Sequence, residues 1–239
     1  MPKHQLFIGE SCQILRGFKT DSFDVACTDP PYSSATAGGF KAPTKTKYTS
    51  TQCNNKFATF AGDSRDQRAF QLWVSIWAGE LFRIIRPGGA LLTFVDHRNL
   101  AAKIDAVQAA GWTYQGVLPW IKKTSRPRKG WFRISAVEYI VLGSKGKQNE
   151  NAYGPHYLKH QPPTDRKHPT EKPVELIKQL LEWRTDWKNI LDPFAGSGTV
   201  FAAAQSLGRT ATAIEISPEY AAIAAKRAPK ITVTKPRKR

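Results

Sequence analysis

The chain has 239 residues, of which 41% are hydrophobic, and its formal net charge is +17. A chain of this size can bury a full core, so we expect a single domain over residues 1–228, followed by a basic tail at 229–239. The excess of Lys and Arg exceeds what solubility requires and indicates a polyanionic partner. The sequence has no apolar run long enough for a membrane span and no signal-peptide core near its start, which predicts a cytoplasmic protein.

The three cysteines, Cys12, Cys27 and Cys53, are odd in number and show no metal-ligand spacing. This pattern favours a reducing compartment and predicts no structural metal.

A buried strand is expected at residues 23–28, after a first strand at 6–8 and a short helix near residues 12–17. The strand ends abruptly at Asp29-Pro30-Pro31-Tyr32, because proline has no N–H for a sheet ladder. The Asp29 and Tyr32 side chains are therefore expected at a strand tip, which is where open α/β sheets bind ligands.

The chemistry of this strand tip suits the exocyclic amino group of a nucleobase. That nitrogen is a poor nucleophile because its lone pair is delocalised into the ring, and two acceptors are needed to draw its hydrogens out of the ring plane. The Asp29 carboxylate and the Pro30 carbonyl can supply them, and Tyr32 offers a flat face for an extruded base. The alternative is that Asp29 caps a turn and Tyr32 fills a gap, and a four-residue motif alone does not decide between the two.

Residues 33–66 show neither the helical nor the strand periodicity of apolar residues. They contain few acids and carry Lys41, Lys45, Lys47 and Lys56. We expect a mobile basic loop that becomes ordered on nucleic acid; an insertion without a role is the alternative. Helical spacing of apolar residues predicts a helix over residues 70–84, followed by a buried strand at 90–95 and a helix at 100–110. Asp96 is expected to cap that last helix.

Two further strands are expected at residues 113–121 and 136–142, joined by a basic hairpin connection at 122–133. Its cations and flat rings suit phosphates and unstacked bases, although a solvated hairpin tip is the alternative. The nucleic-acid-binding candidates in this connection are Lys122, Lys123, Arg126, Arg128, Lys129, Trp131 and Arg133.

Near the C-terminus, the sequence predicts a helix at 174–183 and then a strand, a glycine-containing turn and a helix from Ile190 to Gly208. Gly196 and Gly198 allow close backbone approach to a ligand. Glu215 ends the next strand about 20 residues further on, where an acid can bridge the two hydroxyls of a ribose. No phosphate-binding lysine motif follows the glycines, so the ligand has a ribose but no sign of a pyrophosphate. S-adenosylmethionine fits this description.

Four segments in this order resemble the DNA amino-methyltransferases that act on adenine N6 or cytosine N4. They are Asp29-Pro30-Pro31-Tyr32, His168-Pro169-Thr170-Glu171-Lys172-Pro173, Asp192-Pro193-Phe194-Ala195-Gly196-Ser197-Gly198-Thr199 and Ile214-Glu215-Ile216-Ser217-Pro218-Glu219-Tyr220. The catalytic segment precedes the cofactor segment, as in the circularly permuted beta group of that family. The resemblance implies a Rossmann-like class I methyltransferase fold with a mostly parallel seven-stranded sheet and an antiparallel edge pair.

The resemblance also implies roles for individual residues. Asp29, Pro30, Pro31 and Tyr32 would be catalytic, Glu10 would hold the cofactor's adenine, and Thr170 and Lys172 would lie near the carboxylate of its methionine. The other cofactor-binding candidates are Asp29, Asp192, Pro193, Phe194, Ala195, Gly196, Ser197, Gly198, Thr199, Glu215 and Ile216. The family often has a target-recognition domain before the His-Pro-Thr segment, but residues 144–167 are too few for one. Recognition would then fall to the basic loops or be relaxed.

We therefore expect an enzyme that transfers a methyl group from S-adenosylmethionine to an adenine N6 flipped out of double-stranded DNA, as in restriction-modification systems. Cytosine-N4 methylation, RNA adenine methylation and a non-catalytic basic DNA-binding protein are the alternatives, and Asp rather than Ser at position 29 favours adenine by resemblance. The sequence leaves open whether the chain forms a homodimer. All of this requires that Asp29 and Gly196 share one cavity.

Overall fold

The computed structural model describes residues 3–33, 65–122, 136–147, 154–165 and 171–235. The strands are β1 (His4–Ile8), β2 (Phe23–Thr28), β3 (Ile85–Val95), β4 (Thr113–Ile121), β5 (Val137–Ser144), β6 (Leu158–Lys159), β7 (Asn189–Asp192), β8 (Thr210–Glu215) and β9 (Ile231–Thr234). The helices are α1 (Ser11–Leu15), α3 (Gln67–Ile84), α4 (Leu100–Ala109), α5 (Val174–Glu182), α6 (Thr199–Ser206) and α7 (Pro218–Ala224).

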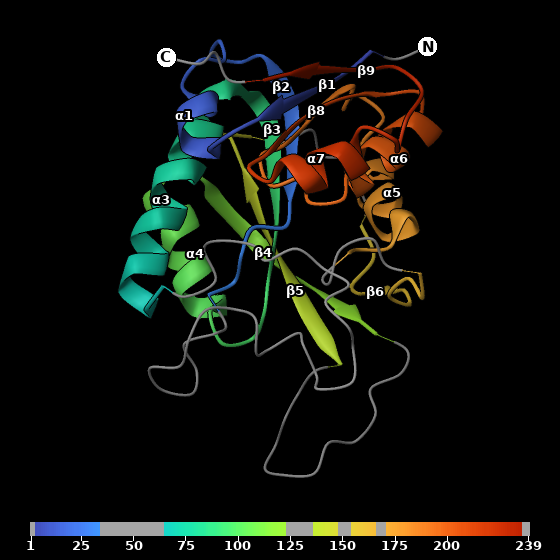
Figure 1. Cartoon of the computed structure of the whole chain (residues 1–239). Coiled ribbons are helices and arrows are strands. Elements are labelled where there is room, and N and C mark those ends of the chain that lie inside the picture. The colour runs from blue at the N-terminus through green and yellow to red at the C-terminus, as the bar shows by residue number, and fades with distance from the viewer. Residues whose placement is uncertain (1–2, 34–64, 123–135, 148–153, 166–170, 236–239) are drawn as a thin grey trace.

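The strands form one sheet with the order β6-β4-β5-β3-β2-β7-β8-β1-β9. Helices cover both faces: α1, α3 and α4 lie on one side and α5, α6 and α7 on the other (Figure 1). Each helix layer packs on the sheet through its own hydrophobic cluster, one around Trp77 and Leu91 and the other around Phe201 and Leu180. This three-layer α/β/α arrangement is the expected fold.

Helix α3 shows how the sequence specifies these layers. The Asp66 side chain caps the helix by accepting from the Ala69 N–H at 2.8 Å. Phe70, Val74, Trp77 and Leu81 recur at helical spacing and are fully buried. Fully burying a large apolar side chain stabilises a fold by about 1.5–3 kcal/mol, so this stripe fixes which face of the helix meets the sheet.

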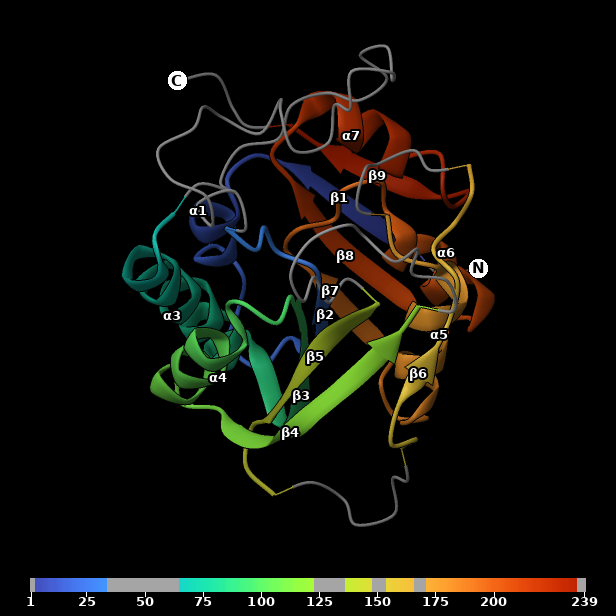
Figure 2. The same cartoon turned by 90° about the horizontal axis from the view of Figure 1, so that it is seen from below.

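The middle of the sheet contains a topological switch point. Strand β2 lies between β3 and β7 and pairs with both in parallel, with Val25 opposite Ile190 in the register of β7. From β2 the chain crosses through α3 to β3, whereas from β7 it crosses through α6 to β8 on the other side, as Figure 2 shows from below. Connections that leave in opposite directions open a crevice at the carboxyl ends of the two strands.

The antiparallel part of the sheet lies where it was expected, with β5 running against both β3 and β4. The expected count of seven strands is wrong, because the described residues contain nine. The two-residue strand β6 extends the β4 edge, within the segment 144–167.

Strand β9 pairs in parallel with β1, so the tail is not wholly unfolded. All four of its residues, Ile231 to Thr234, are β-branched and therefore strong strand formers, and the edge of β1 offers backbone groups for pairing.

Strand β3 begins earlier than expected. The helix was expected to end at the Arg86-Pro87-Gly88-Gly89 segment and the strand to begin at residue 90, but β3 includes this segment because Lys145 bonds its backbone from the neighbouring segment. The Gly88 N–H donates to the Lys145 carbonyl at 2.7 Å, and the Lys145 N–H donates to the Gly89 carbonyl at 3.0 Å.

Several expectations fall outside the described residues. They concern Cys53, Lys41, Lys45, Lys47, Lys56, Lys123, Arg126, Arg128, Lys129, Trp131, Arg133 and Thr170. Among the helices that the structure describes, none has the length and apolar character needed to cross a bilayer.

Candidate active site

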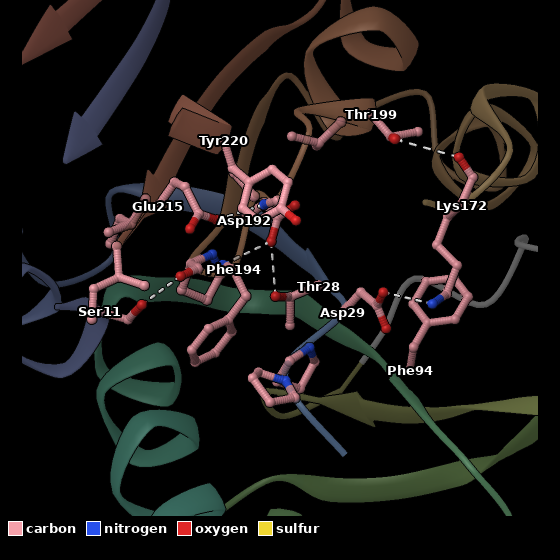
Figure 3. Close-up of a pocket in the computed structure, with 18 of the residues that line it drawn as sticks. Ser11, Thr28, Asp29, Phe94, Lys172, Asp192, Phe194, Thr199, Glu215 and Tyr220 are labelled. Atoms are coloured by element: carbon pink, nitrogen blue, oxygen red, sulfur yellow. Dashed lines mark hydrogen bonds and ion pairs between the residues drawn. The ribbon is translucent and has the colours of Figure 1, made fainter. Parts of the chain in front are cut away.

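A cavity of about 240 Å³ opens at the carboxyl ends of β2 and β7. Its lining includes Asp29 at the tip of β2, Gly196 in the turn after β7, and Glu215 at the end of β8. Figure 3 shows Asp29 and Lys172 facing each other on one side, with Asp192 and Glu215 on the other. The expectation that Asp29 and Gly196 share a cavity is confirmed.

Asp192 joins the two strand ends. Its Oδ1 accepts from the Thr28 hydroxyl, 164 residues away, at 2.8 Å and from the Phe194 N–H at 3.0 Å. Burial raises the pKa of Asp192 to about 7, although both donors oppose the shift. This carboxyl therefore fixes the end of β2 against the glycine turn.

The glycine turn is held by Glu215. The Glu215 Oε2 accepts from the Gly196 N–H at 2.7 Å and Oε1 accepts from the Ser217 N–H at 2.8 Å. Burial raises the pKa of Glu215, while these backbone donors oppose the shift. Gly196 has a φ of 52°, in the left-handed region that glycine adopts without strain. The glutamate expected at a ribose thus also shapes the loop beside it.

Gly198 has a different reason to be glycine than the expected approach of a ligand. It lies at φ 80°, and an added Cβ would come within 2.7 Å of the Cα and Cβ of Ala224 in α7. The missing side chain makes room for a helix of the protein itself.

The cavity wall between β7 and α1 carries an aromatic cluster and the carboxylate of Glu10. The Phe194 ring packs 5.4 Å from Trp73 and 5.6 Å from Trp77, measured between centroids, and the Ser11 hydroxyl donates to the Pro193 carbonyl at 2.5 Å. Glu10 lines the cavity and caps α1 by accepting from the Gln13 N–H at 2.8 Å. Other lining residues from the expected cofactor set are Pro193, Ala195, Ser197, Thr199 and Ile216.

Both oxygens of the Asp29 carboxylate carry a donor. The Tyr32 hydroxyl donates to Oδ1 at 2.5 Å, and the Lys172 ammonium donates to Oδ2 at 2.5 Å. Burial raises the pKa of Asp29; Lys172 opposes the shift and the nearby charge of Glu138 adds to it. Pro30 and Pro31 also line the cavity.

Lys172, expected near the carboxylate of the cofactor's methionine, lines the cavity and has its ammonium on two carboxylates of the protein itself. Its Nζ contacts Asp29 and lies 3.2 Å from Glu138 Oε2, with the rings of Tyr32 and Phe94 at 5.3 and 5.2 Å. Burial by itself would lower the pKa of Lys172, but the two carboxylates together raise it. The backbone of Lys172 does reach the glycine turn, since the Thr199 hydroxyl donates to its carbonyl at 3.3 Å.

Sequence analysis missed Glu138, which β5 brings to this cluster. Its Oε2 lies 3.1 Å from the Tyr32 hydroxyl, whose single proton can bond either Asp29 or Glu138, and its Oε1 accepts from the Lys122 ammonium at 2.5 Å. Burial would raise the pKa of Glu138, but the Lys172 and Lys122 cations lower it to about 2. An acid inside the otherwise apolar strand Val137–Ser144 was the available signal. Lys122, expected to bind nucleic acid, has its ammonium on Glu138.

Asn99 was also missed, and it holds the end of the catalytic segment. Its Nδ2 donates to the Tyr32 carbonyl at 2.6 Å, next to Ser33, whose φ of 54° is unusual for a residue with a side chain. Asp96 accepts from the N–H groups of Arg98 and Asn99 at 3.2 and 3.3 Å, so it orders the turn before α4 while Asn99 occupies the N-cap position.

A switch-point cavity with a glycine turn and an acid at the next strand end defines an α/β protein that binds a nucleoside-like ligand. Among the described residues, no group of three or more His, Cys, Asp or Glu side chains is placed to hold a metal ion. Residues 23–226 match the family model of the N6/N4 type described as DNA methylase. The chain belongs to this DNA methylase family.

Three similar proteins illustrate the relationship. A protein of Escherichia coli (strain K12) named "Putative methylase YubD" is 27% identical over 214 residues, which cover 89% of this chain and 84% of that protein. The structure of the "Putative DNA Modification Methylase" TTHA0409 of Thermus thermophilus, complexed with S-adenosyl-L-methionine, has a TM-score of 0.69 at 22% identity and covers 99% of this chain and 100% of its own. The cytosine-N4-specific PvuII DNA methyltransferase has a TM-score of 0.70 at 19% identity, covering 95% and 87%. The two structures share the fold of this chain.

Proposed function

We propose that the protein is an S-adenosylmethionine-dependent DNA methyltransferase that methylates the N6 amino group of an adenine turned out of the double helix. The observation that carries the proposal is the single cavity that joins the Asp29 strand tip to the Gly196 turn. One side of the cavity offers hydrogen-bond acceptors for an amino group, and the other side offers a site for a nucleoside. The methyl donor and the amine that receives the methyl group can therefore meet in this cavity.

The cofactor would occupy the β7 and β8 side of the cavity. Each Glu215 oxygen accepts one backbone N–H and, as a carboxylate oxygen, has a second lone pair for a ribose hydroxyl. Ile216 is 54% exposed and lines the cavity next to Glu215, where it can cover an adenine ring together with Phe194. The S-adenosyl-L-methionine complex of TTHA0409, which shares this fold, supports the choice of cofactor.

The target base would enter beside Tyr32. The Asp29 carboxylate and the Pro30 carbonyl accept the two N–H groups of the amine, which leaves its lone pair free to attack the methyl carbon. The new N–C bond forms as the S–C bond breaks, the sulfonium becomes a neutral thioether, and the nitrogen then releases one proton. A positively charged protein suits this substrate, because cations neutralise phosphates and offset the few kcal/mol that turning out a base costs.

Asp29 favours adenine as the base, by the resemblance of its segment to adenine-specific family members. Cytosine N4 is the second candidate, because the cytosine-N4-specific PvuII enzyme shares the fold. The same two acceptors would serve either amino group.

The test is product identification. The purified protein is incubated with S-adenosylmethionine and duplex DNA, the DNA is digested to nucleosides, and the products are identified by mass; a matched incubation with structured RNA serves as the comparison. We expect N6-methyldeoxyadenosine from DNA. N4-methyldeoxycytidine alone would overturn the choice of base, methylation of the RNA alone would overturn the choice of substrate, and no methyl transfer to either would overturn the enzyme assignment.

A further inference from the structure

The Asp29 carboxylate is occupied before any substrate is present. Tyr32 donates to one of its oxygens and Lys172 to the other, both at 2.5 Å. A cation in direct contact with a carboxylate weakens it as an acceptor for a neutral amine, because the negative charge is already compensated. The proposed reaction, on which this inference rests, therefore needs these donors to move when the target amine arrives.

Glu138 offers both donors a second acceptor within reach. Its Oε2 lies 3.1 Å from the Tyr32 hydroxyl and 3.2 Å from the Lys172 ammonium, so each donor stands between two carboxylates. Both distances already lie at or just above the upper end of the ordinary hydrogen-bond range, so either donor can change its partner with little movement. Neither donor would then be left unsatisfied in a buried place, which would cost about 1–3 kcal/mol or more for a charged group.

Lys122 keeps Glu138 in position for this exchange. Its ammonium bonds Oε1 at 2.5 Å, on the carboxylate side away from Oε2, and the side chains of Lys122 and Glu138 are only 21% and 17% exposed. Two carboxylates and two ammonium groups make the cluster neutral overall, so moving Lys172 between them keeps the total charge at zero while the carboxylate of Asp29 exchanges its cation for the N–H groups of the amine.

We propose that Glu138 is a positioning residue that takes over the Lys172 ammonium and the Tyr32 hydroxyl when the target amine takes their places on Asp29. The transfer exposes the charge of Asp29 to the amine only while a base is bound. The transfer also frees the Tyr32 hydroxyl from Asp29, so that the ring of Tyr32 can adjust to the face of the base.

The variant Glu138→Gln tests the exchange, because it keeps the size and one acceptor oxygen but removes the charge that would receive Lys172. We expect kcat for DNA methylation to fall about 10- to 100-fold, the equivalent of one hydrogen bond to a charged group. The dissociation constant for S-adenosylmethionine should not change. Asp186→Asn is the matched control: it removes a carboxylate that pairs with Arg86 and Arg184 outside the cavity lining, and it should leave kcat unchanged.

The pH profile of kcat/KM separates positioning from general structural support. The described groups that interact with Asp29 are Lys172, Glu138, Tyr32, Lys103, Asp192 and Cys27, and Lys122 acts through Glu138. The Glu138 charge raises the pKa of Asp29 and the Lys172 charge lowers it. The acid limb, where Asp29 loses its charge, should thus move to lower pH in Glu138→Gln and to higher pH in Lys172→Met. Wild-type kcat in Glu138→Gln, or a lower kcat with an unmoved acid limb, would overturn the proposal.

A structure of the wild-type protein with duplex DNA and S-adenosylhomocysteine tests the same point without any variant. Lys172 Nζ should lie closer to Glu138 than to Asp29, whereas an unchanged Lys172–Asp29 contact beside a bound amine would refute the exchange. The two proposals fail differently. If the wild-type protein transfers no methyl group, the function is wrong; if it does and Glu138→Gln matches it in kcat and pH profile, only the exchange is wrong.

Discussion

The glycine turn and the Asp29 strand tip border one cavity, but different kinds of groups hold the acids at these two places. Glu215 and Asp192 bond backbone N–H groups of Gly196, Ser217 and Phe194. Asp29 instead bonds side chains, the hydroxyl of Tyr32 and the ammonium of Lys172.

Backbone donors are fixed by the fold, whereas side-chain donors can rotate to another partner. The proposed cofactor side is therefore held by fixed groups, whereas the proposed target side is held by groups that can exchange partners. Variants on the two sides of the cavity test this difference.

Replacement of Asp29 by Ala should abolish most turnover. Losing a polar partner at the reacting atom typically costs about 10²–10³ in rate, so we expect kcat to fall at least that far while the affinity for S-adenosylmethionine persists. Methyl transfer to DNA and cofactor titration measure the two quantities. Asp105→Ala on the exposed side of α4 is the control. Wild-type turnover in Asp29→Ala would remove the catalytic role.

Replacement of Glu215 by Ala should act on the opposite side of the cavity. The Gly196 and Ser217 N–H groups would lose their acceptor and the proposed ribose contact would disappear. We expect the dissociation constant for S-adenosylmethionine to rise about 10- to 100-fold, as for the loss of one hydrogen bond to a charged group. Calorimetric titration checks this, with the exposed neighbour Glu219→Ala as control. An unchanged dissociation constant would contradict the ribose assignment.

Replacement of Gly198 by Ala should test how rigid the glycine turn is. The new Cβ would meet Ala224 at 2.7 Å on a backbone with φ 80°, so we expect a loss of roughly 1–3 kcal/mol in the free energy of unfolding. Gly208→Ala is the matched control, since it has φ 66° but no atom within 4 Å of its Cβ position. Thermal unfolding of the two variants separates the steric clash from the backbone strain. Equal losses of stability would show that α7 moves to accommodate the new Cβ at little cost.

Replacement of Asp192 by Asn should change the pH dependence of stability. Burial raises its folded pKa to about 7, above the ordinary value near 3.9. The folded state therefore binds a proton that the unfolded chain has already lost, and this contribution to stability is full below pH ~4 and is lost as the pH rises through ~7.

Asn keeps the acceptor for Thr28 and Phe194 but cannot ionise. We therefore expect the difference in Tm between Asp192→Asn and wild type to be larger at pH 8 than at pH 5. The increase should be about 2–4 °C for each kcal/mol of stability that the ionised carboxylate costs the wild type. A wild-type pH profile in Asp192→Asn would contradict the buried neutral carboxyl.

The sequence predicted most elements because their signals are local. The run at residues 23–28 became β2 with those bounds, and residues 113–121 became β4. Strand β9 was missed because its pairing with β1 depends on an edge far away in the chain. The glycine turn was predicted as a ligand loop, but only the position of α7 shows that Gly198 makes room for Ala224.

We could predict the class of sheet, the order of the two key segments and the residues that can carry the chemistry from the sequence alone, since all of these lie in short contiguous motifs. What each charged side chain contacts depends on the fold. Glu138 and Lys172 are brought to Asp29 by the crossing of β5 and by the segment before α5. No local pattern encodes such contacts, because they arise where strands distant in sequence end side by side.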